Sequence, residues 1–304
     1  MPTEPDAKQT IRERVWSRLV QAQASSDPHG RIPDFVGAAA AAERLAELPA
    51  WQHARVIKAN PDQPQLPVRV RALRDGKLVY MAVPKLAHPL PFFRLDPGEL
   101  GDDAEALAAH RVATLRAPKT AVANMYPVDL IICGTVAVNR QGVRIGKGAG
   151  YSDIEVGLLA ETGLIGPVTI IATTVHQLQV VDEPLPHDEH DFTVDYIVTP
   201  QEIIFCGPAY RHGASCGRIL ARSRLPRSRC WRRWRTTGER SCPGQCPNHP
   251  GVGARPPAKP AGIGRHRRWS RPTAATGGAD RCWEYRWWRC RAGRPPSPRT
   301  GCPT

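Results

Sequence analysis

Apolar residues recur every three to four positions in several parts of the chain, and this spacing predicts helices. In residues 11–23, "IRERVWSRLVQAQ", Ile11, Val15 and Leu19 stand four apart with charged residues between them. That spacing is typical of an amphipathic helix. Three further segments have helical composition or periodicity, and they are residues 37–48, 102–112 and 153–164.

Shorter apolar segments predict β-strands between and after these helices. They are residues 54–59, 68–73, 78–83, 128–134, 168–174, 194–199 and 202–206. The runs "VDLIICG" and "VTIIATT" are almost continuously apolar, as in strands that are buried on both faces of a sheet. The last two segments read as a hairpin around Pro200 and Gln201. Strands that alternate with helices predict a three-layer α/β domain with a largely parallel sheet.

This pattern of alternating elements ends near residue 208. Residues 209–304 are rich in Arg, Pro, Gly, Ser and Trp and have no sustained period of 2 or 3.6. They contain few aliphatic residues, so they cannot bury enough surface to offset the entropy lost on ordering. We therefore expect an α/β domain over residues 1–208 and a disordered basic tail over residues 209–304.

Charge divides at the same boundary. The 304 residues have a formal charge of +14, of which residues 209–304 contribute +19 and residues 1–208 contribute −5. Mixed Arg and Trp in the tail could neutralise phosphates and stack on bases, which would make it a nucleic-acid-binding arm. With Lys nearly absent, the composition is also typical of a GC-rich reading frame read out of register. Both interpretations of the tail, a functional arm or a frameshift product, stay open.

Cysteine usage and the N-terminus bear on the compartment. Cys133 and Cys206 are the two cysteines of residues 1–208, and both lie in apolar segments, which fits a reducing environment. The first ten residues are polar, and no apolar run approaches the roughly 20 residues needed to cross a bilayer. We expect a cytoplasmic monomer without membrane association.

The stretch "GVRIGKGAGYSDIE" at residues 142–155 is the main candidate binding segment. Gly146, Gly148 and Gly150 alternate, so the backbone can approach a ligand closely and adopt positive φ. Between a strand and a helix, such a loop forms an anion site, to which Arg144 and Lys147 add charge. The pattern is neither a P-loop nor the Rossmann fingerprint. From the residues alone, a phosphate site and a structural turn are both open.

Carboxylates near this loop and further along the chain are candidate metal ligands. Asp153 begins a predicted helix, where it could cap the helix or coordinate magnesium on a polyphosphate. The segment "HDEHD" at residues 187–191 is most simply a solvated loop, because adjacent residues mostly point apart. The segment "CPGQCPNH" in the tail lacks a regularly spaced fourth zinc ligand.

The glycine segment resembles the signature of the 5-formyltetrahydrofolate cyclo-ligase family, also called methenyltetrahydrofolate synthetases. In that family an Arg precedes an alternating-glycine loop that ends Gly-Tyr-Tyr-Asp, and the matching residues here are Arg144, Gly146, Gly148, Gly150, Tyr151 and Asp153. Lys8 and Arg12, four apart on the first helix, resemble the family's ATP-phosphate ligands. The segment "LPHDEHDFTVDYIVTP" is similar to the family's closing segment, in which a magnesium ligand matches Asp191. The similarity extends from about residue 8 to about residue 208.

The resemblance implies a Rossmann-like αβα sandwich that binds Mg-ATP and the reduced folate 5-formyltetrahydrofolate. In the family, phosphoryl transfer from ATP activates the formyl oxygen, N10 attacks, and loss of phosphate leaves 5,10-methenyltetrahydrofolate. The implied ATP ligands are Lys8, Arg12, Arg144, Gly146, Lys147, Gly148, Ala149, Gly150 and Tyr151. Arg144, Lys147 and Tyr151 would take part in catalysis, and Asp153 and Asp191 would bind Mg²⁺.

The chain departs from the family pattern at two places. Ser152 stands where the family has the second Tyr of the loop. The Glu that recognises the formyl-pterin in the family has no counterpart in "VIKANPDQPQ", which has Asn60, Pro61 and Asp62 instead. This variant resembles a divergent branch, the methenyltetrahydrofolate synthase domain-containing proteins. Three functions therefore stay open: folate turnover, ATP binding without turnover, and nucleic-acid binding through the tail.

Overall fold

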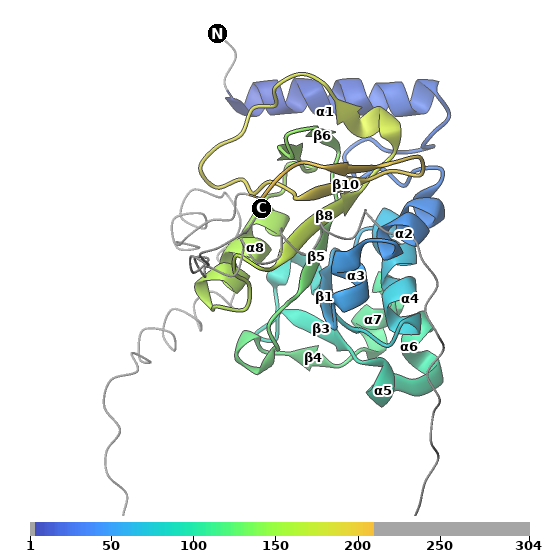
Figure 1. Ribbon diagram of the computed structural model, residues 1–304, viewed down its shortest axis with the longest axis vertical. Coiled ribbons are helices and arrows are strands. Elements are labelled where there is room, and N and C mark those ends of the chain that lie inside the picture. Colours follow the sequence, from blue (N-terminus) through green and yellow to red (C-terminus); the bar gives the residue numbers. More distant parts are fainter. Residues whose placement is uncertain (1–3, 210–304) are drawn as a thin grey trace, which may run out of the picture. The chain divides into compact units, whose positions relative to one another are not determined.

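A computed structural model describes residues 4–209 of the chain (Figure 1). The α-helices are α1 (Glu4–Gln21), α2 (Ala38–Ala46), α3 (Pro49–His53), α4 (Leu66–Arg74), α5 (Pro97–Leu100), α6 (Ala104–Leu107), α7 (His110–Arg116) and α8 (Tyr151–Glu161). Single turns of 3₁₀ helix are η1 (Gln63–Gln65), η2 (Pro84–Leu86), η3 (Gly101–Asp103), η4 (Val122–Asn124) and η5 (Gln177–Gln179). Apart from Ala209, the predicted tail, with its cysteines and its "CPGQCPNH" segment, lies outside the described residues.

Eight strands form one sheet in the order β11-β10-β8-β5-β1-β2-β3-β4. They are β1 (Val56–Ala59), β2 (Leu78–Ala82), β3 (Phe92–Leu95), β4 (Lys119–Thr120), β5 (Leu130–Cys133), β8 (Ile170–Thr174), β10 (Tyr196–Val198) and β11 (Ile203–Phe205). The five strands from β10 to β2 are parallel, and β3, β4 and β11 add antiparallel edges. The predicted largely parallel sheet is confirmed, and so is the hairpin around Pro200 and Gln201.

Helices cover both faces of this sheet, which gives the predicted αβα layers. In Figure 1, α2, α3 and α4 lie on one side of the sheet and α8 lies on the other. Alternate residues of β5 pack into different cores: Ile132 joins the cluster with Leu45 and Trp51, whereas Ile131 joins the cluster with Leu159. Burial on both faces explains why the central strands are almost continuously apolar.

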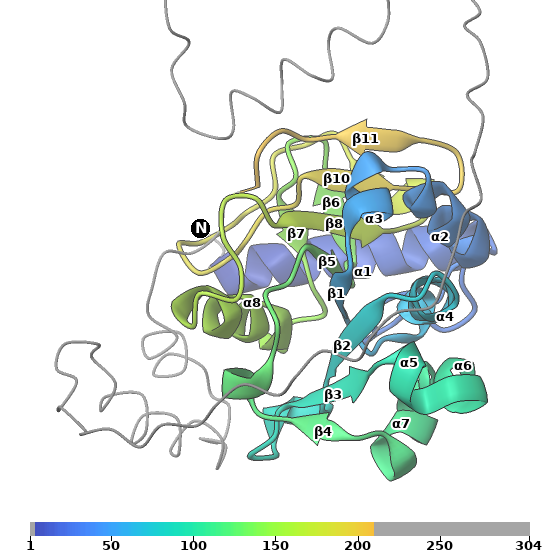
Figure 2. The ribbon, with the colours of Figure 1, turned by 60° about the horizontal axis from the view of Figure 1, so that its bottom comes forward.

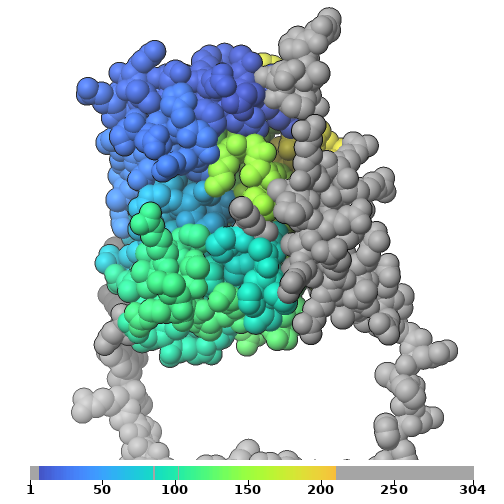
Figure 3. Space-filling model, turned by 180° about the vertical axis from the view of Figure 1, so that it is seen from behind, coloured from blue at the N-terminus to red at the C-terminus, as the bar shows by residue number. Residues whose placement is uncertain are grey.

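Three further helices lie beside the antiparallel edge of the sheet. Figure 2 shows α5, α6 and α7 beside β3 and β4. Seen from behind in Figure 3, the blue N-terminal part borders the cyan and green middle of the chain, with a lime segment after position 150 between them. The N-terminal part therefore lies next to the segment that carries the glycine loop.

A second, three-stranded sheet brings α1 to the glycine loop. Its order is β7-β6-β9, formed by β6 (Ala137–Asn139), β7 (Arg144–Ile145) and β9 (Val180–Val181). The apolar stripe of α1, with Val15 and Leu19 almost fully buried, packs in one cluster with Ala137 and Ile145. Because β7 leads directly into the glycine loop, this packing places the polar side of α1 near that loop.

Two predicted elements differ from the structure. Residues 68–73 were expected to be a strand, but they belong to helix α4. Alternation of Val and Arg suggested a period of two, yet Val68, Ala72 and Leu73 form the buried stripe of a helix. Arg69 is buried too, because its guanidinium donates to the carbonyl oxygen of Ala108 at 2.8 Å. The helix expected over residues 102–112 is split into the short α6 and α7.

Among the described residues, none of the helices combines the length and the apolar character that a bilayer span requires.

Candidate functional site

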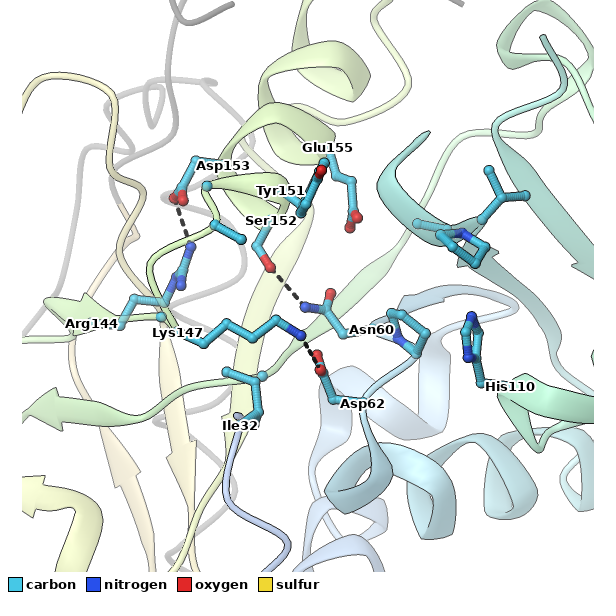
Figure 4. Close-up of a pocket in the computed structure, with 18 residues that line it drawn as sticks. Ile32, Asn60, Asp62, His110, Arg144, Lys147, Tyr151, Ser152, Asp153 and Glu155 are labelled. Carbon is cyan, nitrogen blue, oxygen red and sulfur yellow. Dashed lines mark hydrogen bonds and ion pairs between the residues drawn. The ribbon is translucent and has the colours of Figure 1, made fainter. Parts of the chain in front are cut away.

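A cavity of about 420 Å³ opens where the parallel strands β1, β2 and β5 end. Its walls include Asn60 after β1, Ala82 and Val83 at the end of β2, and Gly134 after β5. The glycine loop and the first turn of α8 form the opposite wall (Figure 4). Ligands of open α/β sheets bind outside the carboxyl ends of the strands, so this cavity is the candidate site.

The glycine loop lines this cavity and has backbone donors without a backbone acceptor among the described residues. Gly148 and Gly150 have φ of +98° and +69°, a conformation that glycine adopts without strain. Gly150 is the N-cap of α8, and no side chain caps the helix. Within residues 4–209, no protein acceptor takes the backbone N–H groups of residues 147–149. Free amides and an uncapped helix N-terminus together make a site for an anion.

Arg144 supplies a fixed positive charge at the base of the loop. Its side chain is only 3% exposed, and its Nη2 donates to Asp153 Oδ1 at 2.6 Å. The guanidinium carbon lies 3.8 Å from the ring centroid of Phe192, which is a cation–π contact. Burial acts to lower the pKa of Arg144. Nearby negative groups, including Asp153 and Asp191, outweigh this effect, so the pKa is raised. Arg144 therefore stays charged.

Lys147 supplies a second, more exposed cation. Its side chain is 40% exposed, and its Nζ lies 2.8 Å from Asp62 Oδ1 across the cavity (Figure 4). Asp62 is in turn positioned by Arg69, whose Nη1 donates to the Asp62 carbonyl oxygen at 3.1 Å. Burial lowers the pKa of Arg69 to about 10, and Asp62 partly opposes this. The ion pair joins the glycine loop to the turn after β1.

The two predicted cations of α1 differ in their relation to the loop. Arg12 Nε donates to the carbonyl oxygen of Gly146 at 2.7 Å, and a Cβ on Gly148 would lie 3.5 Å from Arg12 Cζ. Lys8 Nζ lies 2.5 Å from Asp191 Oδ2. Arg12 thus contacts the loop directly, whereas Lys8 holds the segment that contains Asp191.

The predicted metal ligands are not equivalent either. Asp153 lines the cavity beside the start of α8, whereas Asp191 is not among the lining residues and pairs with Lys8. The described part of the chain contains no group of three or more His, Cys, Asp or Glu side chains that could hold a metal ion. Mg²⁺ is commonly bound by one or two carboxylates together with substrate phosphates. Asp153 fits one such carboxylate.

Sequence reasoning missed a buried polar network behind the first turn of α8. Lys58 on β1 is fully buried, donates to Asn60 Oδ1 at 2.6 Å and forms an ion pair with Glu155. Asn60 Nδ2 donates to Ser152 Oγ at 2.7 Å. A lysine inside the apolar run "ARVIKA" was the available signal, since a buried lysine needs a partner.

His110, the first residue of α7, lines the cavity beside the turn after β1. Its Nε2 is buried and has no hydrogen-bond partner within the described residues. Burial lowers the pKa of His110, Arg69 and Lys147 lower it further, and Asp62 opposes them. The lowered pKa favours the neutral form of the imidazole near pH 7.

Comparisons with known proteins agree with the resemblance seen in the sequence. The model of the 5-formyltetrahydrofolate cyclo-ligase family matches residues 4–200. The chain is 38% identical over 209 residues to the methenyltetrahydrofolate synthase domain-containing protein of Mus musculus, covering 67% of this chain and 56% of that protein. The Bos taurus protein of the same name is 37% identical over 207 residues, with coverage of 66% and 54%. The chain thus spans little more than half the length of these relatives.

Among solved structures, the chain is similar to the 5,10-methenyltetrahydrofolate synthetase of Aquifex aeolicus. The TM-score is 0.43 at 18% identity, covering 68% of this chain and 95% of that one.

Proposed function

The chain belongs to the 5-formyltetrahydrofolate cyclo-ligase family, and from this premise we propose that it converts 5-formyltetrahydrofolate to 5,10-methenyltetrahydrofolate with Mg-ATP. The observation that carries the proposal is the glycine loop, which lines one cavity together with Arg144 and Lys147 and leads into a helix that no side chain caps. The backbone N–H groups of residues 147–149 have no backbone acceptor among the described residues. Backbone donors of this kind suit a polyphosphate. Phosphoryl transfer depends mainly on positioning and on cations that stabilise the spread negative charge.

In this proposal the cations have separate tasks. Arg144, locked between Asp153 and Phe192, holds a constant charge at the base of the loop. Lys147 exchanges its ion pair with Asp62 for the phosphates, to which its partly exposed side chain is accessible. Arg12 keeps the loop in place through the carbonyl of Gly146, and Lys8 supports the segment around Asp191.

Magnesium would neutralise part of the phosphate charge when bound. In the proposal Asp153, which lines the cavity at the exit of the loop, would hold it. Tyr151, on the first turn of α8, also lines the cavity and can pack its ring against a ligand. The predicted role of Asp191 as a magnesium ligand stays a prediction, as do a cytoplasmic location and a monomeric state.

The test is the ATP-dependent appearance of methenyl-folate absorbance when the chain is mixed with 5-formyltetrahydrofolate and Mg-ATP. We expect product with the unaltered chain and about a tenfold lower kcat/KM for Lys147→Met, since a charge-assisted hydrogen bond is worth about 1.5–3 kcal/mol. Lys119→Met, on the edge strand β4 and outside the cavity lining, is the matched control. The absence of ATP-dependent product would contradict the proposal.

One observation favours a second candidate, ATP binding without folate turnover. Asn60 occupies the region where the family resemblance expects a Glu, and both ends of its amide are engaged by Lys58 and Ser152. This candidate predicts thermal stabilisation by Mg-ATP that Asp153→Ala weakens, without any product. Nucleic-acid binding through residues 209–304 stays a prediction, because all of that segment except Ala209 lies outside the described residues.

A further inference from the structure

The two positions at which the chain departs from the family pattern contact each other. Asn60, in the turn that lacks the expected Glu, donates to the hydroxyl of Ser152, which stands in place of a Tyr. A tyrosine ring at position 152 would be much larger than the hydroxyl that receives this bond. The two departures therefore lie in one contact, in which the Asn60 amide has a protein partner at both its oxygen and its nitrogen.

Asn60 is also linked, through Lys58, to a carboxylate that lies one turn further along α8. Lys58 donates to Asn60 and forms an ion pair with Glu155, whose side chain is 5% exposed and lines the cavity. In Figure 4, Tyr151 and Ser152 separate Glu155 from Arg144 and Asp153. The cavity thus has a second polar region, buried and away from the cations of the glycine loop.

The surroundings of Glu155 restrict what it can bind. Lys58 already neutralises its charge, so a cationic ligand would bring a net positive charge into a buried position, which is unfavourable. Neutral N–H donors carry no such penalty and satisfy carboxylate oxygens. Other parts of the cavity are apolar, with Ile32, Val83 and Pro84 among the lining residues, and apolar walls of this kind suit a flat ring.

We propose that Glu155, held by Lys58, is the specificity-determining carboxylate of the cavity and accepts hydrogen bonds from a planar heterocycle with adjacent N–H donors, such as the 2-amino-pyrimidinone edge of a reduced pterin. This assignment rests on the proposed function and moves folate recognition from the turn after β1 to helix α8. The cations of the glycine loop and the pair of Glu155 and Lys58 then bind different ligands.

The experiment measures two affinities separately by calorimetry on the full chain, with 5-formyltetrahydrofolate and with Mg-ATP as probes. Glu155→Gln keeps the shape of the side chain but removes its charge and one acceptor. We expect its dissociation constant for 5-formyltetrahydrofolate to rise at least tenfold, while that for Mg-ATP changes by less than twofold. Glu47→Gln, an exposed glutamate at the end of α2, should leave both constants unchanged.

A second variant guards against loss of folding. Because Glu155→Gln leaves the ammonium of Lys58 buried without its counter-charge, the double variant with Lys58→Met removes both charges and must show the same selective loss. If the folded variants bind 5-formyltetrahydrofolate as tightly as the unaltered chain, or if they lose affinity for Mg-ATP only, the assignment of Glu155 is overturned. The proposed function is not affected by either result. An unaltered chain that binds Mg-ATP but no 5-formyltetrahydrofolate overturns the proposed function as well.

Discussion

His110 is a half-buried histidine at the cavity, and its titration should be visible in the stability of the protein. Its Nε2 lacks a partner within the described residues, and burial is the main cause of its lowered pKa. His176 also has a pKa lowered by burial. A histidine with a lowered pKa in the folded state binds its proton more readily in the unfolded chain, so protonation favours unfolding.

We therefore expect the free energy of unfolding to fall as the pH drops below about 6.5, the ordinary histidine pKa, by at most about 1.4 kcal/mol per pH unit for one proton. His110→Gln should reduce this slope, whereas His187→Gln, on the exposed loop before Asp188, should not. Urea unfolding of the three proteins between pH 7.5 and 5 measures the slope of the free energy of unfolding against pH. Identical slopes for His110→Gln and the unaltered chain would contradict the assigned shift.

Single residues were predictable from sequence only where their role depends on local pattern. Arg144 and Lys147 could be chosen as candidates because alternating glycines mark the loop beside which they lie, and both line the cavity. Lys58 and Glu155 stand 97 positions apart, and nothing local in the sequence indicates that β1 and α8 bring them together. The contact between Asn60 and Ser152 was missed for the same reason: each was noted as a departure, but their proximity depends on the sheet order.

At the scale of elements, the β6–β7 hairpin determines where the glycine loop begins. Its turn is closed by Gly142 N–H donating to the carbonyl of Asn139 at 2.9 Å, and Asn139 Oδ1 accepts from Val143 N–H at 3.0 Å. Gly142 has φ +84°, and a Cβ there would lie 2.3 Å from the carbonyl oxygen of Val194. Only glycine fits both the conformation and the contact.

Gly142→Ala should lower the free energy of unfolding by about 3 kcal/mol, combining αL strain of about 1–2 kcal/mol with an overpacking term. Gly163→Ala, also at positive φ but with open space around its Cβ, should show only the strain term, about 1 kcal/mol. Urea unfolding of both variants provides the comparison. Equal destabilisation would mean that the Val194 contact does not restrict the turn.

Elements with a single strong signal were predicted well, and those with conflicting signals were not. The central strands β5 and β8 and the helix α8 lie where the apolar runs placed them. In α4, Val and Arg alternate, which suggested a strand with Arg on its exposed face. Arg69 is instead buried, so the alternation does not separate buried from exposed positions. A buried arginine bonded to backbone carbonyls of distant segments, including that of Ala108, cannot be recognised from periodicity.

At the scale of the molecule, every residue that lines the cavity lies between positions 32 and 155. The last described residues still contribute to the fold, since Ala209 N–H donates to Asp195 Oδ1 at 2.6 Å and β11 completes one edge of the sheet. The sequence predicted a boundary near residue 208, but sheet order and the second sheet depend on long-range pairing and were not predictable.

A chain ending after Arg211 should therefore keep its melting temperature and its Mg-ATP affinity, whereas one ending after Glu202 should melt several degrees lower because it lacks β11 and the Asp195 contact. Differential scanning calorimetry and titration with Mg-ATP provide the measurements. Loss of nucleotide affinity in the longer variant would mean that residues 212–304 take part in the site.

The different burial of Arg144 and Lys147 has a consequence for how strongly an anion can be held. Arg144 is immobilised by Phe192 and Asp153 when the chain folds, so its rotameric freedom is already lost before a ligand arrives. Only Lys147 must be ordered anew, at a penalty of about 0.5–1.5 kcal/mol for one long side chain. Preorganisation of this kind leaves more of the electrostatic attraction available as net affinity.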